Sequence, residues 1–348
     1  HHFGTSVRAA VSGLLWLASL SILAGQLIGI AWILQVVAGL PKWAGCLIGG
    51  GLMTTYFAAG GLFGSVWVNL VQLAVLLGGF LIAVPFAINH VGGLDAVLAT
   101  AASSGSAGFW NGSASLAFVI LLVPAFISSP GLLQKAFGAE NARAVRLGVG
   151  WNGVVLLAFA FVPALLGMAA RVNHPDLAPE LALPTLLARD LPIGFGSILL
   201  AAIFSAEVST ADAVLFMLST SLSQDLYRRF VRPDASDARV LQVARWSAVI
   251  GGALGVGLAL VMPTIVGALA FFYAMIGATL FVPVLAALHA RTGRRTEITL
   301  SIAAGAAAVI VRQLSGTPAG SLFTPATAGL SVAASTYLTA ALGRRLLR

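Results

Sequence analysis

The polar residues best placed to do chemistry lie in the middle of a long apolar run, residues 196–221. Ser209 and Thr210 stand there side by side, between two acids, Glu207 and Asp212. Ionisable groups at the centre of a membrane span are costly to bury and usually mark functional sites. The run therefore predicts a transmembrane helix that carries a functional polar centre.

Helical spacing sorts these residues into faces. Ala206, Ser209, Thr210 and Ala213 follow the pattern i, i+3, i+4, i+7 and share one stripe. Small side chains on such a stripe let another backbone approach, and two hydroxyl oxygens can face a cation. This pattern predicts half of an ion site inside a membrane transporter. The alternative from the residues alone is that both hydroxyls bond back to the preceding helical turn.

The composition is that of an integral membrane protein. Of the 348 residues, 59% are hydrophobic and 9% are charged, whereas soluble domains are about a quarter charged. Continuous apolar runs predict an all-α protein, because the strands of a membrane barrel would alternate in polarity. The single cysteine, Cys46, excludes an intramolecular disulfide. The five histidines form no metal spacing, and no phosphate loop or nucleophile motif is present, so we expect no enzyme.

Apolar runs of about 20 residues predict ten membrane spans. They are residues 9–37, 44–61, 66–89, 115–129, 147–170, 194–221, 242–262, 264–289, 298–314 and 323–342. We treat residues 1–348 as one transmembrane domain without a separate soluble part.

The positive charges are distributed unevenly between the loops. When successive loops are assigned to alternate sides, fifteen Lys and Arg residues share one side, and only Lys42, Arg171, Arg189 and Arg312 lie on the other. This positive-inside bias predicts an even number of spans, with both ends of this chain in the cytoplasm. The net charge of +8 is thereby explained by topology, and we expect no binding of nucleic acid.

One span is short and interrupted by prolines, at Pro124 and Pro130. This is typical of a discontinuous helix at a binding site near the middle of the membrane, and a plain proline kink is the alternative. If the helix is discontinuous, Phe126, Ser128 and Ser129 are candidates to face the substrate.

Two further residues are candidates to line a cavity. Tyr273, in an aromatic run, is a candidate gate residue or a packing residue. Gln26 is a buried amide that is expected either to face the cavity or to form a hydrogen bond with a neighbouring helix.

Three local patterns occur together in a defined order. The first is Tyr56-Phe57-Ala58-Ala59-Gly60-Gly61, a tight glycine turn that leads into a helix with Asn69 and Gln72 at i, i+3, where two amides can bond across helices. The second is Ser129-Pro130 followed by Gln134-Lys135, and the third is the stretch from Ala206 to Asp212. Together they make the chain resemble the sodium:solute symporter family over nearly its whole length.

The resemblance implies a five-plus-five inverted-repeat fold, with sodium bound between the eighth core helix and an unwound part of the first. The implied sodium ligands here are the carbonyl of Ala206 and the hydroxyls of Ser209 and Thr210. The first span, with Gly25-Gln26-Leu27-Ile28-Gly29, matches the third core helix. We therefore expect core helices three to ten at about 9–289, two peripheral helices at 298–342, and a fold that is N-terminally incomplete, without core helices one and two.

The chain departs from the family's pattern at three positions. Asn69 stands where the family usually has an aspartate, and Lys135 replaces an arginine, which keeps the charge but loses the bidentate fork. Glu207 occupies a position that is commonly apolar, where we expect either an interhelical hydrogen bond in its protonated form or a transport role such as proton coupling or substrate contact. Asp212 is expected to anchor a polar contact between helices.

The function that the resemblance implies is sodium-coupled symport of a small organic solute by alternating access in a cell membrane, most simply a bacterial inner membrane. One alternative is a membrane sensor that uses the same fold to report solute to a signalling partner. Another is a proton-coupled transporter that uses Glu207.

Overall fold

The computed structural model describes residues 5–60, 65–103, 112–129, 139–289, 295–318 and 320–346. The side chains of several residues within these ranges, among them Tyr56 and Asn69, are not described. Within the described ranges the protein consists of helices and connecting turns without a β-strand, which confirms the predicted all-α class.

Every predicted span coincides with a helical segment. The first half of the chain contains α1 (Thr5–Ala38), α2 (Lys42–Gly60), α3 (Ser65–His90), α4 (Leu94–Ser103), α5 (Gly112–Ile127), α7 (Ala142–Phe159) and α8 (Phe161–Asn173). The second half contains α9 (Pro179–Thr185), η2 (Leu186–Asp190), α10 (Ile193–Thr220), η3 (Ser221–Val231), α11 (Asp237–Val261), α12 (Ile265–Ile276), η4 (Gly277–Phe281), α13 (Val282–His289), α14 (Arg295–Leu314) and α15 (Pro325–Leu346). The three η segments are π-helical and continue α9, α10 and α12 with a wider turn.

Seven helical segments in the described part of the chain are long and apolar enough to cross a membrane. They comprise α1, most of α3, α7 with α8, α10 with η3, α11, α12 with its continuation, and α14. The predicted spans at 44–61, 115–129 and 323–342 are the helices α2, α5 and α15, which are not among the seven. Helix α5, of 16 residues, is the short span that the sequence indicated.

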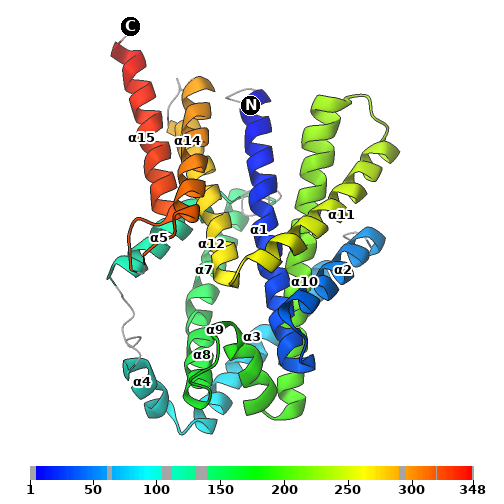
Figure 1. Ribbon diagram of the computed structural model, residues 1–348, viewed down its shortest axis with the longest axis vertical. Helices are drawn as coiled ribbons and strands as arrows, with labels where there is room; N and C mark the ends of the chain where they lie inside the picture. The colour runs from blue at the N-terminus through cyan, green and yellow to red at the C-terminus, as the bar shows by residue number, and fades with distance from the viewer. Residues whose placement is uncertain are drawn as a thin grey trace.

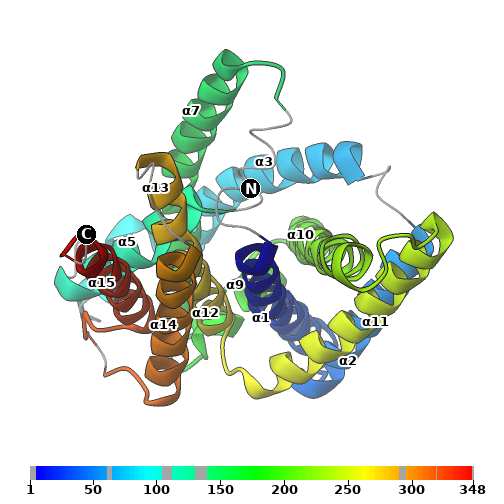
Figure 2. The same ribbon diagram turned by 90° about the horizontal axis from the view of Figure 1, so that it is seen from above.

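Helix α1 lies at the centre of the bundle, in contact with α2, α10, α11 and α12 (Figure 2). Its side chains Leu23, Leu27 and Ile28 are completely or almost completely buried. The approach of α2 is close because a Cβ built on Gly45 would lie 2.6 Å from the Cα of Ala31, so only glycine fits there. The sequence of α1 is apolar on all sides, as expected of a helix surrounded by others.

Helices α14 and α15 pack against each other and against η4, beside this central group (Figure 2). The Ser301 hydroxyl of α14 donates to the carbonyl oxygen of Ala333 in α15 at 2.8 Å. Near one end of the same pair, Arg344 forms an ion pair with the buried carboxylate of Glu297 at 3.1 Å. These contacts join α14 and α15 into one unit along their length.

The first residues of α1 and the last residues of α15 lie at the same end of the molecule (Figure 1). The end of η3 and the start of α14 lie at this end too. An arrangement with both ends on one side agrees with the even number of spans that the charge distribution predicts.

Candidate functional site

Helix α10 has a packed face and an open face, and the predicted ion-site stripe lies on the open face. Ala211, Leu215 and Leu218 are completely buried, in a core shared with α1, α2 and α11. Thr210 and Ala213 are exposed to the surroundings of the described chain. The predicted stripe therefore points away from the packed side of its own helix.

Two of the predicted sodium ligands lie side by side on this open face. The Thr210 hydroxyl donates to the carbonyl oxygen of Ala206 at 2.9 Å. This is the bond back to the preceding turn that the residues alone allowed as an alternative. It also holds two oxygen atoms close enough together to contact one cation. Ser209, one residue before Thr210, is half-buried on the same side.

Glu207 lies on another face of α10 and touches α1. A Cβ built on Gly29 would lie 2.8 Å from Glu207 Oε1, 2.9 Å from its Cδ and 3.1 Å from Oε2. The carboxyl group therefore lies against the backbone of α1, in the space that the side chain of any larger residue at position 29 would occupy. It forms no hydrogen bond or ion pair with another residue in the described ranges, so the interhelical hydrogen bond that we expected as one of its two roles stays a prediction.

The other expected anchor on α10, Asp212, is half-buried, and its Oδ1 atom is enclosed. This oxygen has no hydrogen-bond partner among the residues that the structure describes. A structural role for Asp212 in a polar contact between helices remains a prediction.

The two amides of α3 are only partly described. Asn69 lies within the helix, but its side chain is outside the described set. Gln72 is half-buried, and its Nε2 atom is enclosed without a described hydrogen-bond partner. Pro130, Gln134 and Lys135 lie outside the described residues.

The candidates at the end of α5 are partly brought together. Helix α5 continues through Pro124 and ends at Ile127. The ring of Phe126 stacks on that of Tyr273 in α12, with centroids 5.4 Å apart and an angle of 25° between the planes. Ser128 is buried in the turn that follows, and its hydroxyl has no described hydrogen-bond partner. Ser129 is half-buried beside it.

Gln26 lies on α1, three residues before Gly29, and only 9% of its surface is exposed. Its side chain forms no hydrogen bond with a residue in the described part of the chain. Gln26 is thus a buried amide without a described partner, one helical turn along α1 from Gly29, the glycine that Glu207 contacts.

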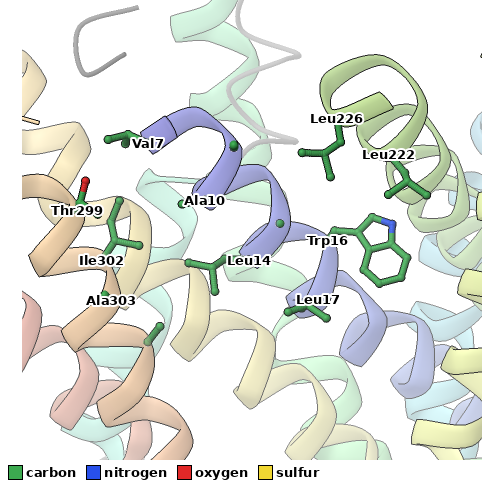
Figure 3. Close-up of a pocket in the computed structure, with 13 residues that line it drawn as sticks. Val7, Ala10, Leu14, Trp16, Leu17, Leu222, Leu226, Thr299, Ile302 and Ala303 are labelled. Carbon is green, nitrogen blue, oxygen red and sulfur yellow. The ribbon is translucent and has the colours of Figure 1, made fainter. Parts of the chain in front are cut away.

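A cavity of about 560 Å³ runs beside the first half of α1 (Figure 3). Ile302 and Ala303 of α14 border it on one side of α1, and Leu222 and Leu226 of η3 border it on the other. Its lining is almost entirely apolar and includes none of the predicted site residues. The cavity therefore lies apart from the polar centre of α10.

Gly29 is the residue of this region that the sequence analysis did not single out as functional. The signal was present, because Gly25 and Gly29 form the small-xxx-small spacing that lets helices approach closely. Its partner was not predictable from that spacing, since Glu207 is distant in the sequence.

Comparisons with known proteins agree with the architecture. The chain is 29% identical over 258 residues to the sodium/pantothenate symporter of Escherichia coli, a match that covers 70% of this chain and 53% of that protein. It is 25% identical over 290 residues to the high-affinity proline transporter PutP of Bacillus subtilis, covering 79% of this chain and 60% of the relative. The chain spans about half the length of the curated relatives it matches.

A solved structure shares the fold. It is a Na⁺-coupled sialic acid symporter in a substrate-bound outward-open state, which superposes with a TM-score of 0.74 at 19% identity and covers 98% of this chain and 75% of that one. The family model of the sodium:solute symporters matches residues 3–297. The chain therefore belongs to the sodium:solute symporter family.

Proposed function

We propose that this chain works in sodium-coupled symport, in which a sodium gradient drives a small organic solute across a membrane by alternating access. The proposal is supported by membership of a family of transporters, which also points away from an enzyme. In such a mechanism, ion binding favours one of two arrangements of the helices over the other. Sodium and the solute are both substrates of the transport cycle.

The sodium ligands in this proposal are the carbonyl oxygen of Ala206 and the hydroxyl oxygens of Ser209 and Thr210. The observation that carries the proposal is the oxygen pair of Ala206 and Thr210, 2.9 Å apart on the open face of a membrane helix. An ion bound there needs further ligands from another segment, because a helix surface supplies oxygens from one side only.

The solute path in this proposal includes Gln26, Phe126, Ser128, Ser129 and Tyr273. Support comes from the stacked rings of Phe126 and Tyr273 and from the enclosed Ser128 hydroxyl. An enclosed hydroxyl without a described partner, two residues along the chain from a stacked aromatic ring, suits a small organic molecule that needs both polar and apolar contacts.

The membrane arrangement in this proposal is a single multi-pass domain with both ends of the chain in the cytoplasm. Residues 9–289 form the core helices, and residues 298–342 form two peripheral helices. Support comes from the common end at which α1 begins and α15 finishes, and from the charge bias of the loops. A bacterial inner membrane is the simplest location.

The test uses the full-length protein, purified and reconstituted, with sodium affinity as the readout. Ser209→Ala and Thr210→Ala each remove one oxygen and are expected to weaken sodium binding by about tenfold or more. Ser219→Ala is the matched control, since this hydroxyl also bonds back along α10, to the Phe216 carbonyl at 3.0 Å, but lies on the packed side. Equal sodium affinity in all three variants and the wild type would contradict the proposal.

A further inference from the structure

The carboxyl group of Glu207 occupies a notch in the surface of α1. Both of its oxygens lie within about 3 Å of the position that a Gly29 Cβ would take, at 2.8 and 3.1 Å. Nothing larger than a hydrogen atom therefore separates the carboxyl from the backbone of α1 at this point. The notch joins two of the helices that pack most closely in the bundle, α1 and α10.

No described charge compensates this carboxylate. Helices α1, α2, α3 and α11 pack against α10, and their described charged side chains lie toward the helix ends, as Lys42 and Asp237 do. Arg245 is nine positions into α11, and no ion pair links it to Glu207. A half-buried carboxylate without a partner is disfavoured, so in its ionised form Glu207 needs a positively charged group from outside the described chain.

A second hydrogen-bond acceptor lies on α1, one helical turn before Gly29. Gln26 precedes Gly29 by three residues on α1, which places the two on neighbouring turns of one face. Its amide is nine-tenths buried and has no hydrogen-bond partner in the described ranges. Gln26 and the glycine that Glu207 contacts are thus one turn apart on α1, and the carboxylate and the amide oxygen both have capacity to accept hydrogen bonds.

We infer that Glu207 and Gln26 receive a protonated amino group of the transported solute. An ammonium group offers several N–H donors and a full positive charge, and the carboxylate and the amide oxygen can each accept one of its hydrogen bonds. The inference rests on the proposed function and names its substrate class: small organic cations that carry an amine.

Sodium and the amine occupy different faces of α10 in this account. Glu207 is about 100° around the helix from Ala206 and about 60° from Thr210, because each residue of an α-helix advances by about 100°. The sodium face is open, whereas Glu207 faces α1. Because Ser209 is about 160° from Glu207, substitutions of these two residues are expected to have separable effects.

The experiment measures ligand-induced thermal stabilisation of the purified full-length protein in sodium and in potassium. The probes are sets of molecules that differ mainly in charge, such as ethanolamine, ethylene glycol and glycolate. Probes with an ammonium group are expected to stabilise the wild type. Glu207→Gln is expected to weaken the binding of these probes by about tenfold to a hundredfold. The sodium affinity of this variant is expected to stay unchanged. Asp212→Asn, an acid-to-amide change on the same helix, is the matched control and leaves amine binding unchanged.

A second variant guards against misfolding of the first. Gly29→Ala keeps Glu207 but pushes its carboxyl out of the notch, and it is expected to reduce amine affinity in the same direction. The inference is overturned if no ammonium probe stabilises the wild type, if neutral or anionic probes bind equally well, or if Glu207→Gln and Asp212→Asn have equal effects.

The two proposals fail in different ways. If ammonium probes bind equally in sodium and potassium and Glu207→Gln abolishes that binding, the amine site stands and sodium coupling does not. If Thr210→Ala abolishes sodium binding but Glu207→Gln leaves amine affinity unchanged, sodium coupling stands and the amine site is wrong.

Discussion

The two faces of α10 differ in burial and in their polar groups although they belong to one helix. On the packed face, Ala211, Leu215 and Leu218 are completely buried against neighbouring helices. On the open face, Thr210 is exposed, and among the residues that the structure describes its hydroxyl is bonded only within its own helix. In this chain the packed face holds the helix against its neighbours, and the open face presents oxygens that further ligands from another segment would complete, so stability and ion binding are assigned to different residues.

The largest effect on stability is expected from Leu215→Ala on the packed face. Removal of a completely buried leucine side chain leaves a cavity, which costs about 2–5 kcal/mol of unfolding free energy. Phe216→Ala is the control on the open side, where 41% of the side chain is exposed, and it should cost less than half as much. Chemical unfolding in detergent measures both, and equal losses would show that the two faces do not differ.

A smaller effect is expected at the contact between α1 and α10. Gly29→Ala forces the Glu207 carboxyl to move and should cost about 1 kcal/mol, since the displaced atoms are the end of a flexible side chain. Gly25→Ala, one turn away, places its Cβ 3.5 Å from the Cβ of Ala268, an ordinary contact, and should be neutral or slightly stabilising. If Gly25→Ala lowered the unfolding free energy more than Gly29→Ala, the contact described between Glu207 and Gly29 would be contradicted.

The smallest effect on stability is expected from Thr210→Ala. The bond from this hydroxyl to Ala206 is local and exposed, so its loss should change the unfolding free energy by less than about 0.5 kcal/mol in potassium. In sodium the wild type should gain stability that the variant lacks, because a ligand that binds only the folded state stabilises it. If sodium raised the unfolding free energy of the wild type and of Thr210→Ala equally, Thr210 would not be a sodium ligand.

Much of the fold was predictable because it depends on properties that are local in the sequence. Each of the ten predicted spans falls on a helical segment, including the short α5, and seven segments in the described part of the chain are long and apolar enough to cross a membrane. The spacing of Ala206, Ser209, Thr210 and Ala213 predicted a common stripe, since helical periodicity fixes which residues share a face. The family motifs gave the identity of the stripe as a candidate sodium site.

The contacts between distant segments were not predictable in the same way. The seat of Glu207 on Gly29 depends on how two helices that are far apart in the sequence approach each other. The stacking of Phe126 on Tyr273 depends on the packing of α5 against α12. The π-helical segments also have no simple sequence signal, because a wider turn arises from the packing around it.

The most direct test of the central claim compares the chemical reactivity of the two faces. On a Cys46→Ala background, which removes the single native thiol, Thr210→Cys and Leu215→Cys are each treated with a membrane-permeant maleimide in sodium and in potassium. The account predicts that the thiol at position 210 reacts readily in potassium and much more slowly in sodium, while the thiol at position 215 stays unreactive in both. Equal reaction rates at position 210 in sodium and potassium would contradict a sodium site on the open face of α10.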